Sequence, residues 1–242
     1  MIDIQKLTIG VRPALKVFRL HTLGGSLVDS LLAARGSTKP LAPDYFHTIG
    51  TNVEKGAYRL ASEDNSNVLT MQPADVIFTK DAYDLESSID LGEFLREFDA
   101  IWKVLDETLH FRDVRRIGIV AETRIWGKSA HRSLFHRLMN LDIPNPFKLN
   151  LRFEERRQTK EGLAPDLEKS DYVNIIHSYY ASSLDTEHPE DDAVNANLDV
   201  QRYYMPWLTS DVPRSAAQVS RTFEREFARL DKILKEIEGY PP

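Results

Sequence analysis

Two long stretches of this sequence carry apolar residues at every third or fourth position, which is the spacing of an amphipathic helix. The first stretch covers residues 91–109 and the second covers residues 214–238. Asp90, with Glu93 three positions later, has the pattern of a capping box and marks the start of the first helix. Each helix must bury its apolar side. An antiparallel sheet with one apolar face is the arrangement that serves both helices.

Stretches in which apolar and polar residues alternate supply the strands of that sheet. In the first half we predict a helix from Ser26 and strands at 14–20, 45–51, 57–62, 68–72 and 76–78. In the second half we predict a helix after Gly127 and strands at 116–126, 147–157, 172–181 and 194–204. The predicted fold class is therefore α+β, with an antiparallel sheet and both long helices packed on one face.

The two halves, 1–110 and 111–242, follow one order of elements: strand, helix, three or more strands, long helix. Gly24-Gly25-Ser26 and Gly127-Lys128-Ser129 lie 103 positions apart, and we interpret both as corners between a strand and a helix. Five of the 25 positions aligned around these segments are identical. Two interpretations stay open, an internal duplication and a similar architecture without common descent. In either case we expect the halves to form one compact unit.

The composition limits the functions that are open to this chain. It contains no cysteine, which excludes disulfides, thiol nucleophiles and cysteine-ligated metals. Its formal net charge of −6 argues against a general nucleic-acid binder. No apolar run is long enough to span a membrane, and the first residues lack the basic and apolar regions of a signal peptide. We therefore expect a cytoplasmic protein with no membrane contact.

The sequence contains no convincing catalytic motif. Gly127-Lys128-Ser129 is similar to the end of a phosphate loop, but Glu122 stands where that motif needs its first glycine. The seven histidines form no metal-binding motif, and there is no G-x-S-x-G elbow around a nucleophilic serine. The sequence therefore indicates no catalytic residue, no cofactor and no metal, and it favours a non-enzymatic protein.

The chemistry that the sequence does suggest lies on the strands of the second half. Alternation places Arg116, Glu122 and Arg124 on one side of their strand. The same rule places Arg152 on the polar side of the next strand, and Asn197 and Asp199 on the polar side of the last. If these strands pair, all six residues share one sheet face. We predict that this face binds a ligand or a protein partner.

The segment from Arg116 to Ile125 reads R-I-G-I-V-A-E-T-R-I. It resembles the strand pattern R-x-G-x-R-Y-x-N-R-I of a sporadically distributed family of uncharacterised bacterial proteins. Leu198-Asp199-Val200 is similar to a late L-D-[IV] strand of that family, and the terminal amphipathic helix also fits. This chain departs from the pattern at Val120, Ala121 and Thr123. The resemblance implies a bacterial α+β protein and brings no known activity with it.

Three functions are compatible with these observations. The preferred one is a non-enzymatic binding module that holds a protein partner or a small ligand on the polar sheet face, a face that would also suit a homodimer. The first alternative is a small-molecule enzyme or ligand carrier with a pocket between the sheet and a long helix. The second alternative is a nucleic-acid-associated protein that uses the basic stretch 111–137.

Overall fold

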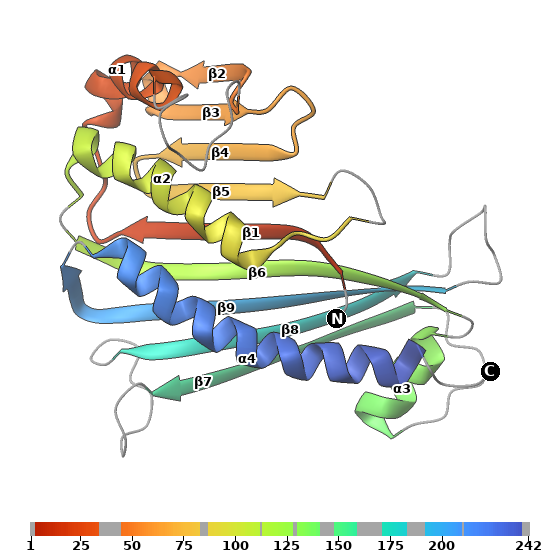
Figure 1. Cartoon of the computed structure of the whole chain (residues 1–242). Helices are drawn as coiled ribbons and strands as arrows, with labels where there is room; N and C mark the ends of the chain where they lie inside the picture. Colours follow the sequence, from red (N-terminus) through yellow and green to blue (C-terminus); the bar gives the residue numbers. More distant parts are fainter. Residues whose placement is uncertain are drawn as a thin grey trace.

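The computed structural model describes residues 3–33, 45–82, 87–111, 113–127, 130–140, 148–158, 171–182, 192–209 and 211–238. These residues form one antiparallel sheet of nine strands in the order β2-β3-β4-β5-β1-β6-β9-β8-β7 (Figure 1). The strands are β1 (Ile4–Pro13), β2 (Thr48–Asn52), β3 (Ala57–Ala61), β4 (Asn67–Gln72), β5 (Asp75–Asp81), β6 (Asp113–Gly127), β7 (Lys148–Gln158), β8 (Tyr172–Ser182) and β9 (Asp192–Thr209). The helices are α1 (Leu20–Ala33), α2 (Leu91–Leu109), α3 (Ala130–Met139) and α4 (Val212–Glu238), with a short 3-10 helix η1 (Val53–Lys55).

The predicted fold class, α+β with an antiparallel sheet, is confirmed. Helix α2 has the predicted bounds, and α4 begins at Val212, two residues before the predicted start. The Asp90 carboxylate accepts a hydrogen bond from the backbone amide of Glu93 at 2.7 Å, so the helix cap forms where the sequence places it. The strands of the second half also begin and end within three residues of their predicted bounds, except that β9 continues to Thr209, five residues beyond the predicted end.

Strands β1 and β6 lie side by side at the middle of the sheet and join the two halves. Gly10 of β1 pairs with Gly118 of β6, and the pairing runs almost the full length of β1. Outward from this centre, β1 pairs with β5 and β6 pairs with β9. The halves 1–110 and 111–242 therefore share one continuous sheet, and their buried side chains form one hydrophobic core.

One face of the sheet is apolar and faces the long helices. In β1 the buried residues Leu7, Ile9 and Val11 alternate with residues that stay partly or fully exposed. Helix α4 contacts β6 and β9, and helix α2 contacts β1, so both lie in front of the sheet in Figure 1. Phe94 of α2 and Phe223 of α4 are buried beneath them. Burying one such side chain stabilises the fold by about 1.5–3 kcal/mol.

The prediction for the start of the chain is wrong. The first strand is β1 at 4–13, residues 14–19 connect it to α1, and Gly24-Gly25-Ser26 lie inside that helix. Gly24 packs against the ring of Tyr58 in β3, where an added Cβ would stand 1.9 Å from the hydroxyl oxygen. This position needs a glycine because α1 packs closely on β3 here, and not because the chain turns. Gly127 is the last residue of β6, so the two glycine-serine segments are not equivalent, and Lys128 and Ser129 lie outside the described residues.

A buried glutamate connects α2 to the sheet. The side chain of Glu97 is only 6% exposed, and its carboxylate accepts a hydrogen bond from the Lys80 ammonium of β5 at 2.9 Å. The Tyr45 hydroxyl donates a second hydrogen bond to it, also at 2.9 Å. Burial, and then the charge of Glu97, raise the pKa of Tyr45, so this hydroxyl keeps its proton and remains a donor. A carboxylate buried in this way is stabilised only while its partners are present.

A second buried glutamate, Glu226, connects α4 to the sheet. Its carboxylate accepts hydrogen bonds from Arg157 of β7 at 2.8 Å and from Arg229 of the same helix at 3.0 Å. Burial acts to raise the pKa of Glu226, but the hydrogen bonds and charges of the two arginines outweigh it and hold the pKa below its ordinary value. Both long helices are therefore fixed to the sheet by a buried carboxylate and a cation from a strand.

Candidate functional site

The six residues predicted as a site all point to the face of the sheet away from the long helices. We call the residues of β6, β9, β8 and β7 on this side the polar face; it lies on the far side of the sheet in Figure 1. Glu122 pairs with Asn197, Asn197 with Ser178, and Ser178 with Arg152, which makes one continuous row across four strands. Asp199 lies two residues from Asn197 along β9, so the structure brings these residues together as predicted.

Arg116 and Arg124 lie at opposite ends of the polar face. They are eight positions apart along β6, which corresponds to about 26 Å at the rise of a strand. Arg124 pairs with Asn195, and Arg116 pairs with Tyr203 near the other end of β9. The predicted site is therefore a surface with two distinct ends and not one compact constellation.

Four side chains cross the polar face at the Arg116 end and form what we call the arginine–tyrosine ladder. The guanidinium of Arg116 lies 5.8 Å from the ring centre of Tyr203 and donates a hydrogen bond to its hydroxyl at 3.4 Å. The rings of Tyr203 and Tyr172 stack at 4.6 Å and are almost parallel. The guanidinium of Arg156 lies 5.9 Å from the Tyr172 ring. Stacking and cation–π contacts therefore connect side chains of four neighbouring strands, and Arg156 is also held by two hydrogen bonds to the Glu154 carboxylate.

Hydrogen-bond acceptors occupy the middle of the polar face. Oδ1 atoms of Asn174, Asn197 and Asp199 are buried and have no hydrogen-bond partner among the described residues. The other carboxylate oxygen of Asp199 accepts a hydrogen bond from Gln201, which in turn accepts one from the Tyr203 hydroxyl. Burial raises the pKa of Asp199 despite that hydrogen bond and the nearby charges of arginines. Buried acceptors without donors are uncommon in folded proteins and mark this area as unusual.

A second arginine lies directly beside the first residue of the ladder. Arg12 of β1 pairs directly with Arg116 of β6, and both point to the polar side of the sheet. Arg12 is exposed, and its side chain has no hydrogen bond or ion pair in the described part of the chain. Arg116 forms its hydrogen bond with Tyr203 and also feels the charge of Asp199. Like charges directly opposite one another on paired strands repel, so this arrangement is unfavourable unless an anion lies between them.

Sequence reasoning missed Arg12, because it did not recognise β1 as a strand. The signal was present, since Leu7, Ile9 and Val11 alternate with polar residues or glycine. Pairing of β1 with β6, which lie more than a hundred residues apart in sequence, is what places Arg12 beside Arg116. No sequence pattern within either strand indicates that β1 and β6 pair with each other.

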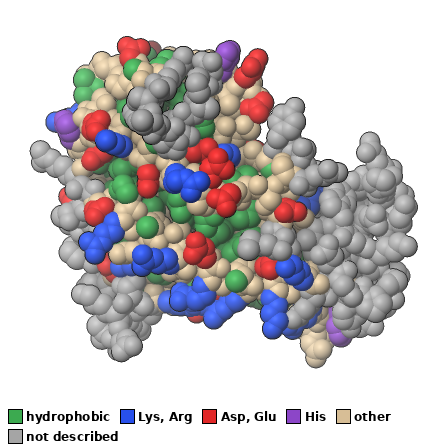
Figure 2. Space-filling view, viewed as in Figure 1, with side chains coloured by type: hydrophobic (Ala, Val, Ile, Leu, Met, Phe, Trp, Pro, Cys, Tyr) green, Lys and Arg blue, Asp and Glu red, His purple; other side chains and the backbone are tan. Residues whose placement is uncertain are grey.

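The basic stretch 111–137 does not form one patch in the described residues. Arg116 and Arg124 lie far apart on β6, and Arg137 belongs to α3. A row of Lys and Arg side chains is visible instead on the helix side, along the lower part of Figure 2, where α4 runs. The exposed basic residues of that helix are Arg214, Arg221, Arg225, Arg229, Lys232 and Lys235.

A pocket of about 570 Å³ lies on the helix side, between the start of α2 and the middle of α4. Its apolar residues include Ile4, Ile89, Leu91, Phe223 and Phe227. The charged residues that line it are all acidic: Asp3, Asp90, Glu224 and Asp231. Figure 2 shows apolar surface among Asp and Glu side chains in this region. Its volume is within the range of small-molecule sites, about 300–1,000 Å³.

Comparisons with known proteins identify no function for these sites. The sequence matches no family model and no curated protein. The resemblance of the segment Arg116–Ile125 to a bacterial family therefore stays a prediction. Among the described residues, no helix is long and apolar enough to cross a membrane, and no group of three or more His, Asp and Glu side chains is placed to hold a metal ion.

Proposed function

We propose that the protein is a binding module, and that an acidic segment of a protein partner lies on the arginine–tyrosine ladder and contacts Arg12. The observation that carries this proposal is the Arg12–Arg116 pair: neither guanidinium forms an ion pair with a described residue, although the charge of Asp199 acts on Arg116. A partner carboxylate between the two guanidiniums would remove their repulsion and accept hydrogen bonds from both. Guanidinium groups match carboxylates in geometry, which lysine does not.

The rigidity of the ladder supports the same proposal. Arg116 is held by Tyr203, and Tyr203 is held by Tyr172 and Gln201. A side chain that is already ordered loses little conformational entropy when a partner binds. Arginine and tyrosine are also the residue types that contribute most to binding energy in protein interfaces. The net charge of −6 disfavours a long nucleic acid, whereas a short acidic segment would contact only the local arginines of this end.

Charge reversal at this pair tests the proposal. We expect the double variant Arg12→Glu/Arg116→Glu to lower partner affinity at least about tenfold, because two attractive contacts become repulsive. The measurement is quantitative affinity capture from the cells of origin, followed by titration of the captured protein with the purified chain. The matched control is Arg214→Glu/Arg221→Glu, an equal change of charge on the exposed side of α4, which we expect to leave the affinity unchanged.

The captured protein must also pass a reciprocal test. Exchanging its acidic residues for lysine should abolish binding to the native chain and restore binding to Arg12→Glu/Arg116→Glu. Binding should weaken as salt is added, since contacts between exposed charges are screened. If the double variant and the native chain bind every captured protein equally well, the ladder is not the binding surface.

We also propose that the two halves are copies of one unit, with α2 equivalent to α4. Residues 94–107 and 223–236 are identical at seven of 14 positions when aligned without gaps. Both begin F-x-R-E-F, and the glutamate of this motif is Glu97 in one helix and Glu226 in the other. Each of these glutamates is buried and contacts a cation of the sheet. A buried glutamate at the same position of both helices supports descent from one unit more strongly than the glycine-serine segments do, although its cation comes from β5 in one half and from β7 in the other.

A second candidate function is a carrier of an apolar cation, and the pocket between α2 and α4 favours it. Its walls are apolar and its charged lining residues are all acidic. Aromatic rings and carboxylates together are suited to an organic ammonium ion.

Benzyltrimethylammonium is a suitable probe of this pocket. We expect it to raise the melting temperature of the native chain, because a ligand that binds only the folded state stabilises it. The increase should be smaller in Asp3→Asn/Glu224→Gln, which removes two exposed charges from the rim. Toluenesulfonate, an anion of similar size, is the control. An equal increase with both compounds, or none with either, would rule out a cation site.

A further inference from the structure

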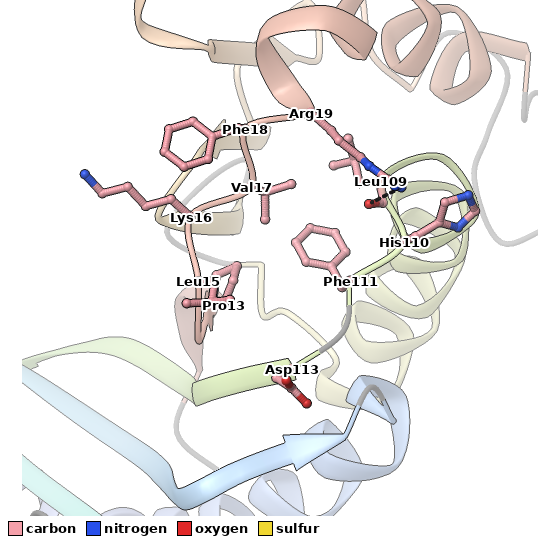
Figure 3. Close-up of a pocket in the computed structure, with 10 residues that line it drawn as sticks. All are labelled: Pro13, Leu15, Lys16, Val17, Phe18, Arg19, Leu109, His110, Phe111 and Asp113. Carbon is pink, nitrogen blue, oxygen red and sulfur yellow. Dashed lines mark hydrogen bonds between the residues drawn. The ribbon is translucent and has the colours of Figure 1, made fainter.

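A second pocket lies at the end of β1, between the connection to α1 and the connection from α2 to β6 (Figure 3). Its volume is about 440 Å³. The apolar residues that line it are Pro13, Leu15, Val17, Phe18, Leu109 and Phe111. Figure 3 shows Val17, Phe18 and Phe111 around the open centre of the pocket. The space is suited to one large apolar side chain.

Two large apolar side chains at this pocket are largely exposed to solvent. Leu15 is 77% exposed and Phe18 is 68% exposed, more than any other large apolar residue described. Single exposed apolar residues are ordinary, but a pair beside a concave apolar surface is typical of an interaction site. Covering both residues would remove a considerable apolar area from water.

The backbone around the exposed residues is held in place. Val17 donates a backbone hydrogen bond to the carbonyl oxygen of Pro73 at 2.8 Å, and Ala14 donates one to that of Asp113 at 3.0 Å. The Arg19 guanidinium donates to the Leu109 carbonyl at the end of α2, the contact drawn as a dashed line in Figure 3. The segment is therefore ordered before anything binds, which lowers the entropic cost of binding.

The charges near the pocket indicate the sign of its ligand. Two basic residues, Lys16 and Arg19, line the pocket, together with one acidic residue, Asp113. The Lys16 ammonium points away from the pocket centre into solvent in Figure 3 and has no partner in the described part of the chain. Arg12 directly precedes Pro13, which is part of the wall; the two side chains lie on opposite sides of β1, so the Arg12–Arg116 pair is reached around the end of this strand. A ligand that combines an apolar group with neighbouring carboxylates is complementary to this surface.

We propose that this pocket takes a large apolar side chain from the acidic partner segment, with the carboxylates of that segment reaching Lys16 on one side and the Arg12–Arg116 pair on the other. The inference rests on the proposed function for the identity of the partner as an acidic protein segment. It adds a hydrophobic anchor, and it places the partner at the shared end of β1 and β6 and not along the whole polar face.

Three synthetic peptides and the isotopically labelled native chain test this proposal by NMR titration. The first peptide is rich in glutamate with one central phenylalanine, the second has alanine in place of phenylalanine, and the third has glutamine in place of every glutamate. We expect the first to shift the amide signals of Leu15, Val17 and Phe18, and the second to bind about tenfold more weakly. The third should also bind more weakly. Equal binding by all three, or no shift at these residues, would overturn the proposal.

Two variants separate this inference from the proposed function. Leu15→Ser/Phe18→Ser changes exposed residues and should abolish the preference for phenylalanine while the peptide still perturbs signals near Arg116. Arg12→Glu/Arg116→Glu should abolish the perturbation near Arg116. Met139→Ser, at an exposed apolar residue of α3, is the control and should bind like the native chain. If the first variant keeps the preference for phenylalanine, the anchor is wrong and the ladder stands. If the second still binds normally, the ladder is wrong.

A single-stranded oligonucleotide of the same charge as the first peptide is the final arm of the experiment. The acidic peptide should bind more tightly, because the pocket contributes only when an apolar side chain enters it. An oligonucleotide that binds as tightly and shifts the same signals would overturn the assignment to a protein segment.

Discussion

Replacing Lys80 by methionine is expected to destabilise the fold by about 3–5 kcal/mol, which is the usual cost of removing one partner from a buried ion pair. Methionine keeps most of the length of the side chain but cannot donate to Glu97. The carboxylate would then stay buried with Tyr45 as its remaining donor in this contact. Chemical denaturation of the native chain and the variant measures the difference in the free energy of unfolding.

Two further variants show whether the buried charge is the cause. Lys103→Met removes an ammonium that is 75% exposed and 4.0 Å from Glu107, and it should change stability very little. Lys80→Met/Glu97→Gln removes both charges and should recover a large part of the loss, because no unpaired ion is left in the interior. If Lys80→Met costs no more than Lys103→Met, the contact between α2 and β5 is not important for stability.

Gly24→Ala and Gly25→Ala are expected to have effects of opposite sign, although the two residues are neighbours in α1. Alanine is the better helix former by about 0.5–1 kcal/mol, and nothing lies within 4 Å of an added Cβ at Gly25, so that variant should be more stable. At Gly24 the Cβ would overlap the buried ring of Tyr58, and overpacking of this kind costs about 1–3 kcal/mol. Thermal and chemical unfolding of both variants measure the two effects.

A third variant checks the cause of the loss at Gly24. Tyr58→Leu removes the ring that the new methyl group would meet, so Gly24→Ala should be much less harmful on that background than on the native one. If both glycine variants are stabilising, α1 does not pack as closely on β3 as the structure shows.

The elements that could be predicted from the sequence are those whose pattern is long and is decided locally. Helix α2 repeats its apolar spacing from Leu91 to Leu109 and begins at a capping residue, so both its existence and its bounds follow from the pattern. Alternation along β6 and β9 was enough to place Glu122 and Asn197 on the same face, because successive side chains of a strand point to opposite sides. The pairing register of β6 and β9 then makes these two residues direct neighbours on that face.

What could not be predicted depends on contacts between distant parts of the chain. In the sequence, Gly24 is typical of a turn, and only the folded structure shows that the ring of Tyr58 lies against it. Residues 14–20 alternate as well as β1 does, and only the pairing of β1 with β5 and β6 decides which of the two is a strand. The ladder likewise requires three strands to align so that Arg116, Tyr203 and Tyr172 become neighbours.

The central position of β1 has a consequence for how the chain reaches its folded state. This strand precedes the other described strands in the chain, yet one of its two neighbours is β6, whose residues follow more than a hundred positions later. Pairing at such a separation in sequence must overcome a large loss of chain entropy and is slow. Until β6 arrives, the edge of β1 is an open template for strands of other chains. Newly made protein is therefore most prone to aggregate in the interval between the synthesis of its two halves.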